Sequence, residues 1–175
     1  SNAVVELVLG LMFSLARHIP RADHSMKHGN WEKKQLKGSE LAGKSLGIVG
    51  YGRIGQLWGE KAKLLGMEVL AYDPYVEHRD LVPMDTLLES ADFLTIHVPL
   101  TDETRHLIDA PALAKMKDGV YIVQASRGGT IEEEALSEAV QSGKVAGAAV
   151  YVYTEEPPER SGLRKLVELP QVVAT

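Results

Sequence analysis

The residues best suited to bind a ligand lie in the segment GIVGYGRIG, which starts at Gly47. Gly50, Gly52 and Gly55 form the pattern G-x-G-x-x-G directly after an apolar run. In this pattern the first glycine permits a tight turn, the second lets a pyrophosphate approach the backbone, and the third lets helix and strand pack closely. The following helix would present free N–H groups and a favourable dipole to the phosphates. The same glycines could also form a tight strand-to-helix turn that holds no ligand.

Asp73 is the acidic residue expected to accompany such a turn. It ends the next apolar run, 18 positions after Gly55, which is close to the spacing of a carboxylate that binds an adenosine ribose. A carboxylate there accepts hydrogen bonds from the ribose hydroxyls and repels a 2′-phosphate, so it favours NAD over NADP. Because Pro74 follows, Asp73 could also form a turn, and the two roles are compatible.

Arg127 and His97 are further candidates for contact with a ligand. Each ends or follows an apolar run, and ligands of open α/β sheets bind at the carboxyl edge of the strands. The guanidinium of Arg127 could bind a carboxylate through two parallel bonds, or Arg127 could be a surface residue before a glycine turn. His97 could face the ligand or be structural. His24 and His28 stand one helical turn apart without a third ligand, so we expect no metal site.

Alternating apolar runs and amphipathic segments would position these residues. Strands are expected at residues 45–50, 67–73, 92–98, 119–125, 145–152 and 171–175. Helices are expected at residues 53–66, 84–91, 109–116 and 130–143. Asp109 is an expected N-cap, Thr130 and Glu133 have capping-box spacing, and Gly66 and Gly143 are expected C-caps. The alternation predicts a single α/β domain with a doubly wound, mostly parallel sheet of the Rossmann type.

Residues 1–20 are apolar around nearly the whole circumference of a helix. A helix of this kind must be covered on more than one side, so we expect it at the subunit interface of a homodimer. It is too short to span a bilayer comfortably, and Glu6 interrupts it, so we expect no membrane partner. Residues 21–43 are polar and predict a short helix followed by a surface connection.

The bulk composition excludes several classes of function. The chain has 175 residues, of which 45% are apolar and 25% charged, as in an ordinary globular domain. A net charge of -5 argues against binding to a nucleic acid. The absence of cysteine excludes disulfides, thiolate zinc sites and cysteine nucleophiles, and it fits a cytoplasmic location.

Together these residues resemble the coenzyme-binding domain of the D-2-hydroxyacid dehydrogenase family. The resemblance covers almost the whole chain, and it rests on the segments VELVLGLMFSLAR, LAGKSLGIVGYGRIG, YDP, HVPLTDETRHLID, ASRGGTIEEEALSEAVQSGKVAGAA and TEEPP. Within the family, residues 25–50 are most similar to 3-phosphoglycerate dehydrogenases, which act in serine biosynthesis.

The resemblance implies hydride transfer between NAD and the C2 carbon of a D-2-hydroxy acid or 2-keto acid. Arg127 would hold the substrate carboxylate, and Glu156 would orient a histidine that serves as general acid and base. Val98 would border the adenosine half of NAD and Ser126 the nicotinamide half. The full set of expected coenzyme contacts is Gly50, Gly52, Arg53, Ile54, Gly55, Asp73, Pro74, His97, Val98, Pro99, Ala125, Ser126, Arg127 and Tyr151.

The sequence departs from the family pattern in two ways. The family's histidine and its substrate domain lie outside residues 1–175, so we expect a coenzyme domain excised from a two-domain enzyme and inactive alone. Tyr151 replaces the family's aspartate, which accepts a hydrogen bond from the nicotinamide carboxamide. A phenol could accept the same bond, fill the nicotinamide pocket, or pack as an ordinary aromatic residue. Gln124 replaces an asparagine, which is a milder change.

Two alternative functions remain open. The family includes NAD-sensing transcriptional corepressors, so the chain could be a binding module in which NAD tightens dimers or partner binding. The second alternative is a natural or engineered variant with impaired coenzyme binding, and Tyr151 motivates it.

Overall fold

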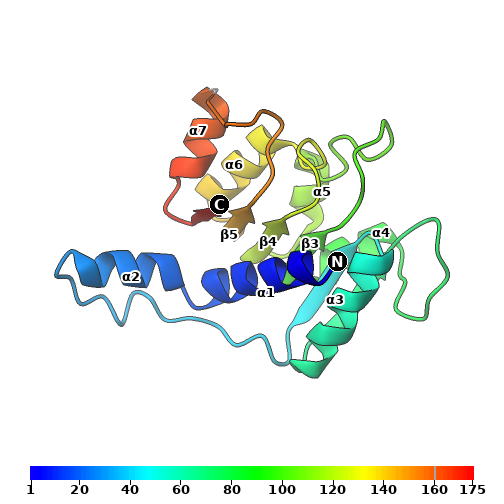
Figure 1. Ribbon diagram of the computed structural model, residues 1–175, viewed down its shortest axis with the longest axis horizontal. Coiled ribbons are helices and arrows are strands. Elements are labelled where there is room, and N and C mark those ends of the chain that lie inside the picture. The colour runs from blue at the N-terminus through cyan, green and yellow to red at the C-terminus, as the bar shows by residue number, and fades with distance from the viewer. Residues whose placement is uncertain (160) are drawn as a thin grey trace.

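The computed structural model describes residues 1–159 and 161–175, which form one sheet covered by helices on both faces (Figure 1). The strands are β1 (Ser45–Val49), β2 (Glu68–Tyr72), β3 (Phe93–Ile96), β4 (Val120–Gln124), β5 (Val145–Val150) and β6 (Val172–Ala174). They lie in the order β2-β1-β3-β4-β5-β6, and every neighbouring pair is parallel. The predicted doubly wound α/β fold is therefore confirmed.

The helices divide between the two faces of the sheet. One face is covered by α1 (Asn2–Ala16) and α3 (Arg53–Leu64). The other is covered by α4 (Met84–Ser90), α5 (Ala110–Lys115), α6 (Glu133–Ser142) and α7 (Ser161–Glu168). A hydrophobic core lies on each face of the sheet. Successive residues of β1 point into opposite cores, because side chains alternate across a strand. Ile48 packs in the core beneath α1 and α3, and Val49 packs in the opposite core.

The strand order creates the position for a ligand site. The chain passes from β1 to β2 on one side and then returns to place β3 on the other side of β1. Such a reversal is the point at which open α/β sheets bind ligands, outside the carboxyl ends of the strands. Gly50, Asp73 and His97 immediately follow β1, β2 and β3, so all three lie at this edge.

The helix predicted at residues 130–143 begins later than expected. It starts at Glu133, and its N-cap is Glu132. The hydroxyl of Thr130 donates to the carbonyl oxygen of Arg127, 3.0 Å away, so the predicted capping box is wrong. The predicted caps Asp109 and Gly143 are confirmed, whereas the C-cap of α3 is Leu65 and the predicted Gly66 follows it with a φ of 81°. The carboxylate of Asp109 accepts from the N–H of Ala112, and Gly143 has the left-handed conformation with φ 84°.

The N-terminal helix is also shorter than predicted. It ends at Ala16, and α2 (Ile19–Lys27) follows at a bend of 60° through His18, which has a φ of 53°. Figure 1 shows α2 projecting beyond the body of the domain. Among the described residues, no single helix is long and apolar enough to cross a membrane, although α1 and α2 meet that criterion as a bent pair.

Gly55 is the residue at which α3 packs most closely on the glycine turn. A Cβ atom there would lie 2.2 Å from the carbonyl oxygen of Gly50. We expect Gly55→Ala to lower the free energy of unfolding by about 2–3 kcal/mol, because both groups in the clash are backbone. Urea denaturation measures this change. Gly162→Ala in α7 is the matched control, since its Cβ would meet no atom of the described residues within 4 Å, and an equal effect of both changes would contradict the prediction.

Candidate coenzyme-binding site

The glycine turn after β1 is tightly enclosed by protein at its ends and open in its middle. Gly50 has a φ of +91°, and a Cβ there would lie 2.6 Å from the carbonyl oxygen of His97. At Gly52, by contrast, a Cβ would meet no atom of the described residues within 4 Å. Gly52 is the N-cap of α3, and no side chain in the described part of the chain caps that helix. The start of α3 is therefore left without a side-chain cap, as helix starts that bind anions are.

Asp73 is held beside this turn by two backbone groups. Its Oδ2 accepts from the N–H of Tyr51 at 2.8 Å, and its Oδ1 accepts from the N–H of Tyr75 at 2.9 Å. A carboxylate has about four lone-pair directions, so both oxygens can accept further bonds. The turn-forming role and an available acceptor for ribose hydroxyls are thus combined in one residue.

A cleft of about 610 Å³ lies at this edge of the sheet. Its volume suits a nucleoside-sized ligand. Seven of the residues predicted to contact the coenzyme line it: Gly50, Gly52, Asp73, Pro74, His97, Val98 and Pro99. The structure therefore brings together segments that are far apart in the sequence. They meet because each follows a parallel strand, and the carboxyl ends of parallel strands lie at one edge of the sheet.

The cleft is also lined by residues that were not among the predicted coenzyme contacts. They are Tyr72, Tyr75, Thr101, Asp102, Glu103, Thr104 and Leu107. The hydroxyl of Tyr75 donates to the carboxylate of Glu103, which joins the loop after β2 to the loop after β3. Most of them lie in the segments YDP and HVPLTDETRHLID, which supported the family resemblance, but no residue-level pattern singled them out as contacts.

His97 forms part of the cleft wall as a neutral side chain. Its Nε2 lies 3.1 Å from the hydroxyl of Thr95, and burial lowers the pKa of the imidazole to about 4. At neutral pH the ring therefore adds an uncharged polar surface to the wall of the cleft.

The segment after β4 is shaped by the side chain of Gln124. Its Nε2 donates to the hydroxyl of Thr130 at 2.6 Å and to the carbonyl oxygen of Arg127 at 3.1 Å. Its Oε1 accepts from the hydroxyl of Ser126 at 2.9 Å. Gln124 and Ser126 are buried, so this network determines the path of the turn that carries Arg127.

Arg127 itself is exposed, and one guanidinium nitrogen donates to the carbonyl oxygen of Ser126 at 2.8 Å. Arg53, Ile54 and Gly55 form the first turn of α3. Among the described residues, neither that turn nor residues 125–127 line the cleft. The predicted nicotinamide-side residues thus lie at the ends of β4 and β5 and do not line the cleft.

Tyr151 is the first residue after β5. Its N–H donates to the carbonyl oxygen of Gln124 at 2.9 Å, so the pairing of β4 with β5, in register from Tyr121 onward, continues to this point. Its side chain is 48% exposed. The ring is therefore not part of the core and is accessible at the carboxyl edge of the sheet.

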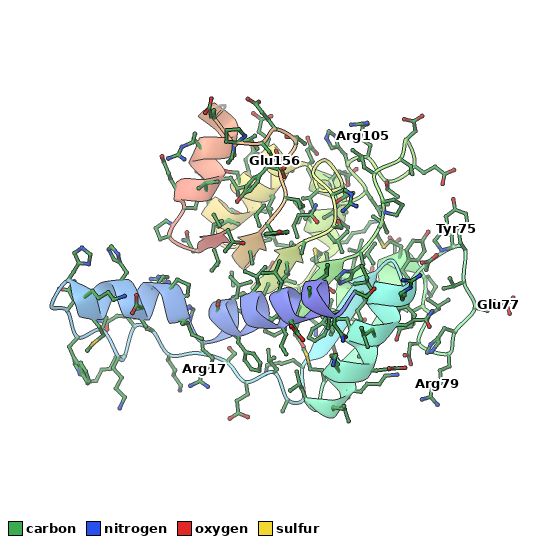
Figure 2. The ribbon with its side chains drawn as sticks, in the orientation of Figure 1. Arg17, Tyr75, Glu77, Arg79, Arg105 and Glu156 are labelled. Carbon is green, nitrogen blue, oxygen red and sulfur yellow. The ribbon has the colours of Figure 1, made fainter. Side chains whose placement is uncertain are left out.

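The two turns that carry Arg127 and Glu156 pack against each other. A Cβ at Gly128 would lie 1.9 Å from the carbonyl oxygen of Tyr153, so only glycine permits this approach. The carboxylate of Glu156, labelled in Figure 2 on the loop after β5, accepts from the N–H of Tyr153 at 3.1 Å. Tertiary structure therefore places the loops of both predicted catalytic residues side by side.

Glu133 strengthens this contact from the start of α6. Its carboxylate accepts from the N–H of Thr154 at 2.8 Å and from the hydroxyl of Thr154 at 2.6 Å. Both bonds involve a charged acceptor, which makes them stronger than bonds between neutral groups. Glu133 was predicted to take part in a capping box, but it instead connects the loop of Glu156 to α6, the helix that follows the Arg127 turn.

Sequence comparison assigns the chain to a family. A sequence model described as D-isomer specific 2-hydroxyacid dehydrogenase, NAD binding domain, matches residues 9–175. The hydroxypyruvate reductase of Thermotoga maritima is 53% identical over 99% of this chain and 58% of its own length. A D-3-phosphoglycerate dehydrogenase of Methanocaldococcus jannaschii is 46% identical over 95% of this chain and 33% of its own. This chain therefore spans between a third and three-fifths of the length of these relatives.

Solved structures agree with this assignment. The pyruvate reductase of Chlamydomonas reinhardtii has a TM-score of 0.92 and 33% identity, and the match covers 98% of this chain and 58% of that one. A D-lactate dehydrogenase of Aquifex aeolicus, solved with NAD and lactic acid, has a TM-score of 0.90, 29% identity and the same coverage. The chain belongs to the D-2-hydroxyacid dehydrogenase family as an NAD-binding domain, and the predicted family and coenzyme are confirmed.

The lowered pKa of His97 predicts a loss of stability in acid. The folded chain binds a proton at His97 only near pH 4, whereas an unfolded histidine binds one near pH 6.5. Stability from neutral His97 is therefore present above pH 6.5 and is lost as the pH falls toward 4, by roughly 2–3 kcal/mol at pH 4.5.

Urea unfolding at pH 7 and pH 4.5 measures this loss. In His97→Gln the free energy of unfolding should fall less between the two pH values, because the titrating imidazole is absent. His24→Gln on exposed α2 should leave the difference unchanged. Equal pH dependence in the wild type and His97→Gln would show that His97 does not titrate in this way.

Proposed function

We propose that the chain binds NAD with its adenosine half in the cleft between the loops after β2 and β3. The observation that carries this proposal is the arrangement of Asp73 beside the open glycine turn, with its carboxylate oriented by the N–H groups of Tyr51 and Tyr75. Asp73 would accept from the adenosine ribose hydroxyls, and a 2′-phosphate would be repelled by its charge.

The remaining residues divide between the other parts of the coenzyme. The N–H groups at the start of α3, with Arg53 and Ile54, would hold the pyrophosphate. Val98, Pro99 and neutral His97 would form the wall beside the adenosine. Bound NAD supplies a nicotinamide ring that accepts or gives a hydride.

We further propose that the parent protein is an NAD-dependent dehydrogenase of D-2-hydroxy acids. Arg127, exposed at the sheet edge, would bind the substrate carboxylate through its guanidinium. Glu156 would orient a histidine that acts as general acid and base. The contact of the two turns at Gly128 supports this pairing of roles, because it holds both residues at one end of the sheet.

For the substrate we propose 3-phosphoglycerate, and with it a role in serine biosynthesis. The similarity of residues 25–50 to phosphoglycerate dehydrogenases and several relatives of that name support it. Hydroxypyruvate is the alternative, supported by the name of the Thermotoga relative. Both molecules carry the carboxylate and C2 oxygen that Arg127 would serve, so steady-state kinetics of the parent enzyme with each would decide between them.

Calorimetric titration of residues 1–175 with ADP-ribose and with NAD tests the proposed coenzyme site. We expect both to bind, and we expect Asp73→Ala to weaken both by about tenfold, since a hydrogen bond to a charged group is lost. Failure of both ligands to bind the wild type at millimolar concentration would contradict the proposal.

Tyr151→Asp tests whether the phenol impairs the nicotinamide half. The ring is exposed at the place where the family has an aspartate, so we expect this change to tighten NAD by about tenfold while ADP-ribose binds as before. The same titrations measure both ligands. If NAD gains nothing, Tyr151 does not obstruct or weaken the nicotinamide contact, and the hypothesis of a coenzyme-impaired variant fails.

We also propose that the chain forms a homodimer through its N-terminal part, which consists of α1, α2 and the connection that follows α2. Ile19 is 50% exposed, Met26 56% and Trp31 76%, which is unusual exposure for large apolar side chains. Sedimentation at tens of micromolar should show a dimer, and Met26→Glu should shift it toward monomer. A wild-type monomer would contradict this proposal. Dimerisation that strengthens with NAD would favour the corepressor-like binding module, and unchanged association would count against it.

A further inference from the structure

Tyr51, between the first two glycines of the turn, has a buried side chain with 1% of its surface exposed. The ring lies against α3, where a Cβ on Gly59 would be 2.5 Å from the phenol oxygen. The glycine pattern assigns no role to this position, and a coenzyme in the cleft would not need a hydroxyl here. The side chain must therefore be explained by its protein contacts.

The hydroxyl of Tyr51 is joined to the far end of the loop that follows β2. It donates to Oδ2 of Asp80 at 2.8 Å, and the same oxygen accepts from the ammonium group of Lys63 in α3. The ring of His78 stands edge-on to the ring of Tyr51 at 5.0 Å. The carbonyl oxygen of Asp80 also accepts from the N–H of Ala71 in β2 at 2.9 Å. Asp80 is thus attached to the turn, to α3 and to the sheet.

The backbone of Tyr51 is joined to the near end of the same loop. Its N–H donates to Oδ2 of Asp73 at 2.8 Å. One residue therefore holds both ends of the segment from Asp73 to Asp80. Most of the middle of that segment is exposed, and Figure 2 shows the side chains of Tyr75, Glu77 and Arg79 pointing outward along it, while Val76 packs against the core.

The charges of this cluster favour the observed hydrogen bond. Burial alone would raise the pKa of Asp80, but Lys63 and Tyr51 outweigh it and hold that pKa below its usual value. Burial and the hydrogen bond to Asp80 raise the pKa of the Tyr51 phenol well above its usual value. At neutral pH the pair is therefore a protonated phenol donating to a carboxylate.

We infer that Tyr51 is a positioning residue for the ribose-binding carboxylate and contributes to the preference for a free 2′-hydroxyl over a 2′-phosphate. The inference rests on the proposed coenzyme site. Discrimination by Asp73 requires its charge to stay where the 2′ position of the ribose would lie. The loop between Asp73 and Asp80 is exposed over most of its length, so its attachment through the Tyr51 side chain limits how far Asp73 can move.

Tyr51→Phe tests the inference, because it keeps the buried ring and removes only the hydroxyl. We expect ADP-ribose to bind about three- to tenfold more weakly, the usual effect of one lost hydrogen bond. We expect 2′-phospho-ADP-ribose to weaken less, so the ratio of the two affinities falls. Tyr121→Phe is the matched control, since Tyr121 is partly buried at the amino end of β4, away from the carboxyl edge, and this change should leave the ratio unchanged.

Asp80→Ala removes the other partner and should lower the same ratio. The double variant should be no worse than Asp80→Ala alone, because Asp80→Ala already breaks the bond that Tyr51→Phe removes, together with the bond from Lys63. Urea unfolding of each variant accounts for any loss of folded protein, which would weaken both ligands equally and leave their ratio unchanged. An unchanged ratio in Tyr51→Phe, or additive effects in the double variant, would overturn the inference. A wild type that binds neither ligand would instead overturn the proposed site on which the inference rests.

Discussion

The close packing of the glycine turn between β3 and α3 is the constraint on which the rest of the site depends. Gly55 approaches the carbonyl oxygen of Gly50, and Gly50 approaches the carbonyl oxygen of His97. Side chains at these positions would force the helix away from the sheet. Because the turn cannot move, the start of α3, the side chain of Tyr51 and the carboxylate of Asp73 all occupy defined positions relative to one another.

A second close backbone approach organises the other end of the carboxyl edge. Gly128 lies against Tyr153, and Glu133 accepts two hydrogen bonds from Thr154. These contacts join the turn after β4 to the loop after β5. In both places a glycine allows two backbone segments to come close together, and a carboxylate nearby accepts hydrogen bonds from a loop. The carboxylate is that of Asp73 in the first place and that of Glu133 in the second. A glycine contact together with hydrogen bonds to a carboxylate thus positions both the loops of the cleft and the loops that carry the proposed substrate-side residues.

Much of the fold could be predicted because local patterns encode it. The strands are continuous apolar runs, as buried parallel strands are, and their predicted positions were correct to within two residues. The errors fall where local signals are ambiguous. Thr130 has the spacing of a capping box, but its hydroxyl is engaged with Arg127 and Gln124. Helix α7 was missed because it is only eight residues long and follows a proline-rich loop.

The sequence alone determined the α/β class, the glycine turn, the acidic residue after β2 and the family, since each depends on residue types at short, regular spacings. The tertiary structure decided which loops meet. It joined Tyr51 to Asp80 and Tyr75 to Glu103, and it left the ring of Tyr151 exposed. The physical reason is that hydrogen bonds between loops 28 or 29 residues apart depend on how parallel strands are ordered in the sheet, which no local periodicity specifies.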